Sequence, residues 1–342
     1  MPNAPNHQHG CALLFAEDLM AALETYFPHA TEKAKTALRF YDQHYVSIGQ
    51  WILQPGQKTV LRSSQPGTCR FCRLSVPRVT FKTEAHALPE CTGNKSLTTE
   101  YECDTCNHIF GTGIENDFGA WTKAQRTLSG IKGKKNQVPA LKEVSSDRQW
   151  RLEHDAIGLK LTHDKGDPIA VVDETTKHIT LTVPCDPYTP VAVLKAFTKM
   201  ALSLLPDEEM PNFQHALAWI RNPDHQVRLV KPGAFPLLYT FVPGNDPLGN
   251  FVQLLRRKTD DLSVPYALFI LTYGNEVFQT VIPSPECDAH IAGRGLPYFP
   301  NARELDRDLQ PIGSVQREPI DLTGCAIVKG EMMRTIMRYG PS

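Results

Sequence analysis

Apolar residues recur at helical intervals through residues 17–53, and Pro28 interrupts this pattern. Proline lacks a backbone N–H and breaks a helix interior, so the pattern predicts two short helices that pack together. The turn-forming sequences QPGQ and SSQPGT follow these helices. We therefore expect an N-terminal helical segment over residues 1–62.

The pattern changes from helical to strand-like periodicity at about residue 152. Runs rich in β-branched and aromatic residues predict strands at residues 156–163, 169–173, 179–184, 237–242, 251–257, 265–274 and 276–283. The last two should be joined at Gly274 and Asn275. Helices are expected at residues 213–220 and 189–205, the latter with an apolar face of Val191, Leu194, Phe197, Met200 and Ala201. These elements predict an α+β fold class, with residues 152–342 forming a C-terminal α+β domain that contains an antiparallel sheet.

The chain has 342 residues, of which 41% are apolar and 21% charged, with a formal net charge of -1. This length exceeds what one hydrophobic core usually supports, so we expect more than one compact unit. No apolar run is long enough to span a bilayer, and residues 1–15 lack the features of a secretory signal. We expect a soluble, cytoplasmic protein without a membrane partner.

Four of the nine cysteines form two CxxC pairs, Cys69 with Cys72 and Cys103 with Cys106. In a protein without an export signal, this spacing favours a metal site over disulfides. Two such pairs can complete a tetrahedral Cys₄ shell around a structural Zn²⁺, which would replace part of the core that a short segment lacks. The others are expected to be buried free thiols, namely Cys11, Cys91, Cys185, Cys287 and Cys325.

The residues between the two pairs resemble those of the HNH endonucleases. In the group concerned, a CxxC pair precedes a short strand that ends in His, two apolar residues and Pro, and a second CxxC pair is followed at once by Asn. His86 in FKTEAHALPE and Asn107 in ECDTCNHIFG match this pattern. The resemblance covers the segment from Cys69 to Phe118 and predicts an HNH module over residues 63–121.

The resemblance implies a β-hairpin and a helix around a catalytic divalent ion, with zinc holding the ends together. His86 would be the general base that takes a proton from the attacking water, because histidine can accept a proton near neutral pH. Asn107 would match the family's metal-ligand position. The ion would be Mg²⁺ or Mn²⁺, and DNA is the nucleic acid that the family favours.

Two positions differ from the family pattern. The family commonly has an acidic metal ligand directly before the histidine, where this chain has Ala85. Glu84 lies on the same face of the strand as His86 and could replace that ligand, as could Glu115 on the following helix. The middle polar position, which supports the loop that presents the histidine, could be Asn94, Thr98 or Thr99.

Residues 122–151 contain eight basic residues and two acidic ones, the strongest charge asymmetry in the chain. An isolated run of this kind is usually a solvated linker. Directly after a nuclease-like module, however, its lysines are candidate phosphate contacts that bind nucleic acid without reading its sequence. The candidates are Lys123, Lys132, Lys134 and Lys135.

Three functions are compatible with these features. The first is a metal-dependent endonuclease. The second is a catalytically inactive, zinc-dependent nucleic-acid-binding module, in which Ala85 has replaced the acidic ligand. The third is a nuclease gated by a C-terminal sensor domain, by analogy with bacterial defence proteins. Whether the chain forms a homo-oligomer stays open.

Overall fold

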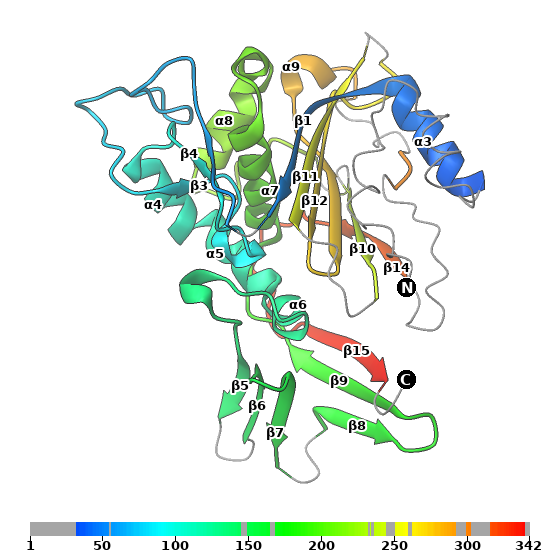
Figure 1. Ribbon diagram of the computed structural model, residues 1–342. Helices are drawn as coiled ribbons and strands as arrows, with labels where there is room; N and C mark the ends of the chain where they lie inside the picture. The colour runs from blue at the N-terminus through cyan, green and yellow to red at the C-terminus, as the bar shows by residue number, and fades with distance from the viewer. Residues whose placement is uncertain are drawn as a thin grey trace, which may run out of the picture.

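The computed structural model describes residues 32–54, 56–144, 149–164, 168–231, 233, 236–243, 250–258, 262–291, 299–301 and 315–338. It combines helices with antiparallel sheets, which confirms the predicted α+β class (Figure 1). None of the helices in these ranges has the length and hydrophobicity needed to cross a lipid bilayer.

The largest element is a six-stranded sheet in the order β1-β11-β12-β13-β10-β14, in which every neighbouring pair is antiparallel. Strands β12 and β13 form the hairpin predicted at Gly274, whose φ of 55° suits the turn. The strands are β1 (Tyr45–Leu53), β10 (Pro236–Phe241), β11 (Asn250–Arg257), β12 (Ala267–Tyr273), β13 (Glu276–Val281) and β14 (Gln316–Asp321).

Both faces of the central strands β11, β12 and β13 are buried, because their residues alternate between two hydrophobic cores. In β12, Phe269 and Leu271 belong to the larger core, whereas Leu268 and Ile270 belong to a smaller one that includes Tyr41 of helix α3 (Glu32–His44). The larger core also contains helix α7 (Pro190–Leu204) and the cysteine-rich segment. These two regions therefore share one core.

Helix α7 is buried at every one of its 15 residues. The sequence pattern predicted a helix here but only one apolar face. The difference arises because α7 lies between the large sheet and the cysteine-rich segment (Figure 1), so its polar residues Lys195 and Lys199 are buried as well. The remaining helices of this region are η4 (Asp207–Phe213), α8 (Gln214–Arg221) and α9 (Pro285–Asp288).

The N-terminal prediction is partly wrong. Residues 45–53, expected as part of a helix, form strand β1, and residues 59–61 form β2. The apolar residues of β1 pack on the sheet through pairing with β11, which is nearly 200 residues away in sequence, so local periodicity misled the prediction. The first predicted helix and Cys11 lie outside the described residues.

Two small sheets, in the orders β5-β6-β7 and β15-β9-β8, enclose a third core that includes Leu141, Trp150, Leu181 and Val183. Residues 122–151, expected to be a linker, supply part of this core. They contain α6 (Lys123–Leu128), η3 (Lys134–Asn136), β5 (Leu141–Val144) and the start of β6 (Gln149–His154). The other strands are β7 (Leu159–His163), β8 (Ala170–Asp173), β9 (His178–Pro184) and β15 (Met332–Arg338).

The cysteine-rich segment has short strands followed by helices. Strand β3 (Ala85–His86) pairs antiparallel with β4 (Leu97–Thr99), which also pairs parallel with β2 (Thr59–Leu61). Next come α4 (Asp104–Thr112) and α5 (Ile114–Trp121), and a 3₁₀ turn, η2 (Glu90–Thr92), lies between β3 and β4. The order of strand, strand and helix matches the predicted arrangement.

Candidate active site and metal centre

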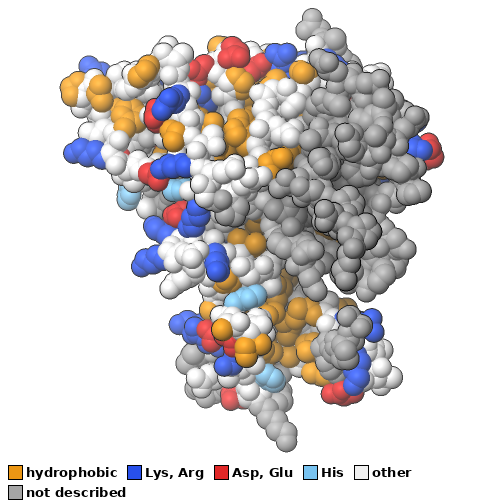
Figure 2. Space-filling view, in the orientation of Figure 1, with side chains coloured by type: hydrophobic (Ala, Val, Ile, Leu, Met, Phe, Trp, Pro, Cys, Tyr) orange, Lys and Arg blue, Asp and Glu red, His pale blue; other side chains and the backbone are white. Residues whose placement is uncertain are grey.

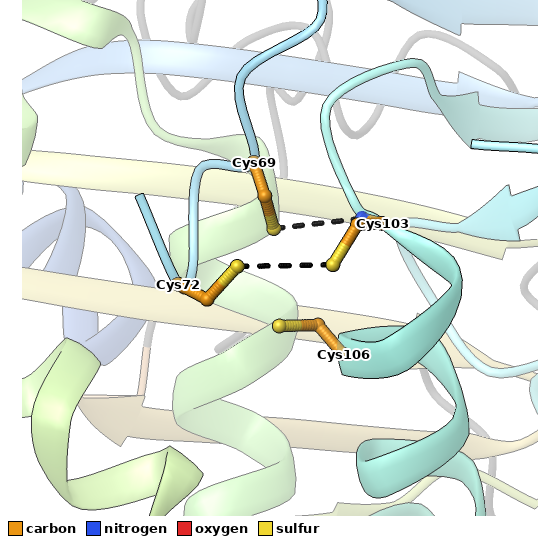
Figure 3. A group of neighbouring side chains, drawn as sticks. All are labelled: Cys69, Cys72, Cys103 and Cys106. Atoms are coloured by element: carbon orange, nitrogen blue, oxygen red, sulfur yellow. Dashed lines mark hydrogen bonds between the residues drawn. The ribbon is translucent and has the colours of Figure 1, made fainter. Parts of the chain in front are cut away.

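The four cysteines of the two CxxC pairs converge on one point (Figure 3). Their sulfur atoms all lie within 4.8 Å of one another. Cys72 Sγ and Cys103 Sγ are 3.8 Å apart, close to the separation of about 3.8 Å that follows from tetrahedral Zn–S bonds of about 2.3 Å. The donor set and its spacing therefore suit a tetrahedral metal ion.

Local backbone structure explains why the sulfurs meet. The first pair lies on a tight turn in which the Arg73 N–H donates to the Cys69 carbonyl at 2.9 Å. Cys103 is the residue before helix α4, and Cys106 lies in its first turn. The Cys103 N–H also points at Cys69 Sγ, 3.5 Å away, which connects the two turns.

The electrostatics of the cluster stabilise a thiolate at Cys69 and oppose further thiolate charge at Cys103 and Cys106. A hydrogen bond from Cys106 lowers the pKa of the Cys69 thiol, against the effect of burial, whereas burial raises the pKa of Cys103. A metal ion would compensate the charge of further thiolates. Cys91, Cys185, Cys287 and Cys325 are free thiols and only half-buried.

His86 is held by strand β3, where it pairs with Thr98 and is flanked by the fully buried residues Ala85 and Ala87. Burial lowers the pKa of its imidazole below the usual value, and the carboxylates of Glu90 and Glu84 oppose this shift. The ring is therefore neutral near pH 7, the form that can accept a proton.

His86 lines a groove of about 1500 Å³, which Asn107, Glu84 and Glu115 also line. One wall comes from residues 83–91 and helices α4 and α5, and the other from α6 and from residues within 132–140 and 151–155. Figure 2 shows Lys and Arg side chains gathered on the left of the molecule, between its upper part and the two small sheets. Four of the five predicted catalytic residues thus line one cavity.

Each predicted carboxylate of the groove has a basic partner. Glu84 forms an ion pair with Lys58, and Glu115 Oε1 lies 2.9 Å from Lys199 Nζ. Together with the Asn107 amide, these carboxylates provide oxygen donors of the kind that Mg²⁺ and Mn²⁺ prefer. The donor chemistry of the groove fits such an ion.

Asn94 is fully buried and is not one of the groove-lining residues. Its Nδ2 donates to the carbonyls of Leu88 and Leu97 at 2.9 and 3.0 Å. Its Oδ1 accepts from the N–H groups of Ser96 and Leu97. These bonds tie Leu88, at the end of the loop that follows His86, to strand β4. Asn94 therefore supports this loop.

Asp104 connects the segment that precedes His86 to the cysteine cluster. Its carboxylate accepts hydrogen bonds from the Lys82 and Thr83 N–H groups, at 3.0 and 2.7 Å, and from the Thr80 hydroxyl. These bonds lower the pKa of Asp104. The residue next to Cys103 thereby anchors the segment that leads into β3.

The predicted phosphate-binding lysines differ in their positions. Lys132 and Lys134 are exposed and line the groove. Lys123 also lines it, but its Nζ lies 2.7 Å from Asp186 Oδ2. Lys135 is exposed next to this wall, at a backbone φ of 58°.

Glu90 and His108 line the groove but were not among the predicted site residues. Glu90 is the carboxylate whose charge acts most strongly on His86, and Lys95 Nζ, 2.7 Å away, keeps its pKa low despite partial burial. The sequence could have identified Glu90, because it directly follows Pro89, which matches the family pattern. His108, the residue after Asn107, is exposed on α4.

Comparison with known families agrees with this geometry. Residues 69–121 match the family model described as HNH endonuclease, which confirms the resemblance found in the sequence. The match indicates a nuclease-type module over these residues. No curated protein and no solved structure matches the chain.

Proposed function

We propose that this protein is a metal-dependent endonuclease that hydrolyses phosphodiester bonds in DNA, with His86 as the general base. The observation that carries the proposal is the shared groove of His86, Asn107 and several carboxylates beside the cysteine cluster. The family match over residues 69–121 supports the same reaction class.

In this proposal the neutral His86 imidazole takes a proton from the water that attacks phosphorus. The chemistry supplied by a bound Mg²⁺ or Mn²⁺ is stabilisation of negative charge on the phosphate and on the leaving 3′ oxygen. Asn107 and a groove carboxylate would hold that ion. Asn94 supports the loop that carries His86. The four cysteines would hold a Zn²⁺, which would connect the Cys69–Cys72 turn to the start of α4.

Three carboxylates are candidates for the ligand of the divalent ion. Glu84 and Glu115 were expected from the sequence, and Glu90 is added because it lines the same groove and acts on His86. All three are paired with lysines. A divalent cation would have to compete with one of these ammonium groups for its carboxylate.

The test is cleavage of supercoiled plasmid DNA with Mg²⁺ or Mn²⁺, beside a sample containing excess chelator. We expect nicked or linear product only with the divalent ion. If the wild-type chain binds DNA but leaves it intact with either ion, the second candidate function, an inactive binding module, is the better one. Ala85 at the acidic position and the three lysine-paired carboxylates favour that alternative.

The lowered pKa of His86 predicts the acidic limb of the rate profile. A general base works only when it is deprotonated, so kcat/KM should fall as pH drops through the pKa of the free enzyme's base. Because burial lowers that pKa, we expect the half-maximal point below about pH 6.5, the ordinary histidine value. Initial cleavage rates measured at subsaturating DNA check this. An acidic limb above that value would contradict this role for His86.

The exposed lysines of the groove predict a salt-dependent contribution to DNA binding. Removing both charges in Lys132→Ala/Lys134→Ala should weaken binding at low salt and lower the slope of log K against log [salt] by about 2, roughly one per phosphate contact. Fluorescence anisotropy with labelled duplexes measures the slope. Lys33→Ala, which changes an exposed lysine on helix α3 that is not one of the groove residues, is the control. Equal slopes for both variants would remove these lysines from the interface.

A further inference from the structure

Lys199 connects helix α7 to the candidate active site. Its Nζ donates a hydrogen bond to the backbone carbonyl of His86 at 3.1 Å. The same atom lies 3.1 Å from Glu102 Oε2 and 2.9 Å from Glu115 Oε1. One ammonium group from the C-terminal half thus contacts the histidine strand, the residue before Cys103 and helix α5.

This contact is deeply buried. The side chains of Lys199 and Glu102 are 1% and 0% exposed. Both oxygens of Glu102 lack a well-aligned hydrogen-bond donor in the described part of the chain, and Lys199 Nζ forms an ion pair with one of them. Burial raises the pKa of Glu102 to about 7, and the charge of Lys199 opposes this shift. Burial would lower the pKa of Lys199, but the two carboxylates raise it above the usual value. The ammonium is therefore charged.

A buried charge of this kind needs a specific geometry of partners. The rings of Phe71 and Phe110 lie 6.0 and 5.7 Å from Lys199 Nζ and enclose it between the first cysteine turn and α4. Neither the ammonium nor its partners can move far without exposing an uncompensated charge to an apolar core. These contacts of Lys199 therefore hold the His86 backbone and the Glu115 side chain in place relative to α7.

We propose that Lys199 is a positioning residue of the nuclease site, which holds the His86 backbone and the Glu115 carboxylate in fixed relative positions. This inference rests on the proposed function. It also means that the C-terminal half completes the HNH site. A displacement of about 1 Å in a catalytic group can reduce a rate about 100-fold.

Lys195 provides a matched control. It lies one turn earlier on α7 and is as deeply buried as Lys199. Its Nζ donates to the Asn222 carbonyl at 2.7 Å and lies 3.3 Å from His225 Nδ1. Both partners follow helix α8 and belong to neither the groove nor the cysteine cluster. Replacing either lysine removes a buried charge from the same helix.

The experiment compares full-length Lys199→Met and Lys195→Met in plasmid cleavage, with zinc content and thermal unfolding measured on the same samples. We expect Lys199→Met to lower kcat about 10- to 100-fold, with little change in KM for DNA or in bound zinc. Lys195→Met should keep the wild-type kcat per folded molecule.

Two further variants separate positioning from charge balance. Lys199→Arg, which keeps the charge, should retain more of kcat than Lys199→Met. Lys199→Met leaves two carboxylates without their ion pair, and the double variant Lys199→Met/Glu102→Gln removes the more deeply buried one. It should therefore recover part of the lost thermal stability but not kcat. Recovery of wild-type kcat in the double variant, or an unchanged kcat in Lys199→Met, would overturn the inference. Failure of the proposed function would instead appear as a wild-type protein that does not cleave.

Discussion

His86→Ala should lower the rate of phosphodiester cleavage by about 10²- to 10⁴-fold, the usual contribution of a general base. The substitution keeps the backbone that pairs with Thr98 and that accepts the hydrogen bond from Lys199. The imidazole lines an open groove, so its removal leaves no enclosed cavity. We therefore expect unchanged zinc content and an unchanged unfolding temperature, and DNA affinity close to that of the wild type.

The measurement is the initial rate of plasmid cleavage at saturating Mg²⁺ or Mn²⁺. His163→Ala is a suitable control, because His163 is exposed on β7 and is not one of the groove residues; this variant should cleave like the wild type. A His86→Ala protein that retains full activity would exclude the imidazole as the base, even if the chain proves to be a nuclease.

The metal centre and the histidine loop could be predicted from the sequence because their determinants are local. Two residues between the cysteines of each pair suffice to form a tight turn or the first turn of a helix. The position of His86 three residues before Pro89 identified the strand end. Such short-range geometry depends little on the rest of the fold. For this reason the four cysteines converge as expected, and His86 and Asn107 line one groove. Their catalytic roles stay predictions.

The rest of the site depends on contacts between residues far apart in the chain. Lys199 lies 113 residues after His86, in a helix whose pattern predicted only core packing. Strand β1 was expected to be helical because its partner β11 comes about 200 residues later. The periodicity of apolar residues indicates which residues are buried, but it does not indicate which segments contact each other.

The charged segment 122–151 shows a related difficulty. Its lysines dominated the composition and suggested a linker, yet Leu141 and Trp150 alternate with polar residues along β5 and β6 and pack in the third core. A few well-placed apolar residues were enough to fold this segment. Consequently the basic wall of the groove is part of a folded unit, and this gives Lys132 and Lys134 defined positions in the groove that His86 also lines.

Cys103→Ser should remove the bound metal and destabilise the cysteine-rich segment. Serine is a poor zinc ligand, and the three remaining thiols, of which Cys69 and Cys106 are buried, would lose the cation that compensates their charge. Loss of a structural metal belongs to the most damaging kinds of substitution, above about 4 kcal/mol in unfolding free energy. Because Cys103 belongs to the same core as α7, the effect should extend into the groove.

Three measurements check this prediction: zinc content by atomic absorption, thermal unfolding, and limited proteolysis. We expect about one Zn²⁺ per wild-type chain and none in Cys103→Ser, with early cleavage within residues 63–121. Cys91→Ser is the matched control, since it makes the same chemical change in the same segment but outside the cluster. It should keep its zinc and unfold near the wild-type temperature. A wild-type protein that folds fully without metal would refute the role given to the cysteines, because their turns would then need no shared ion to meet.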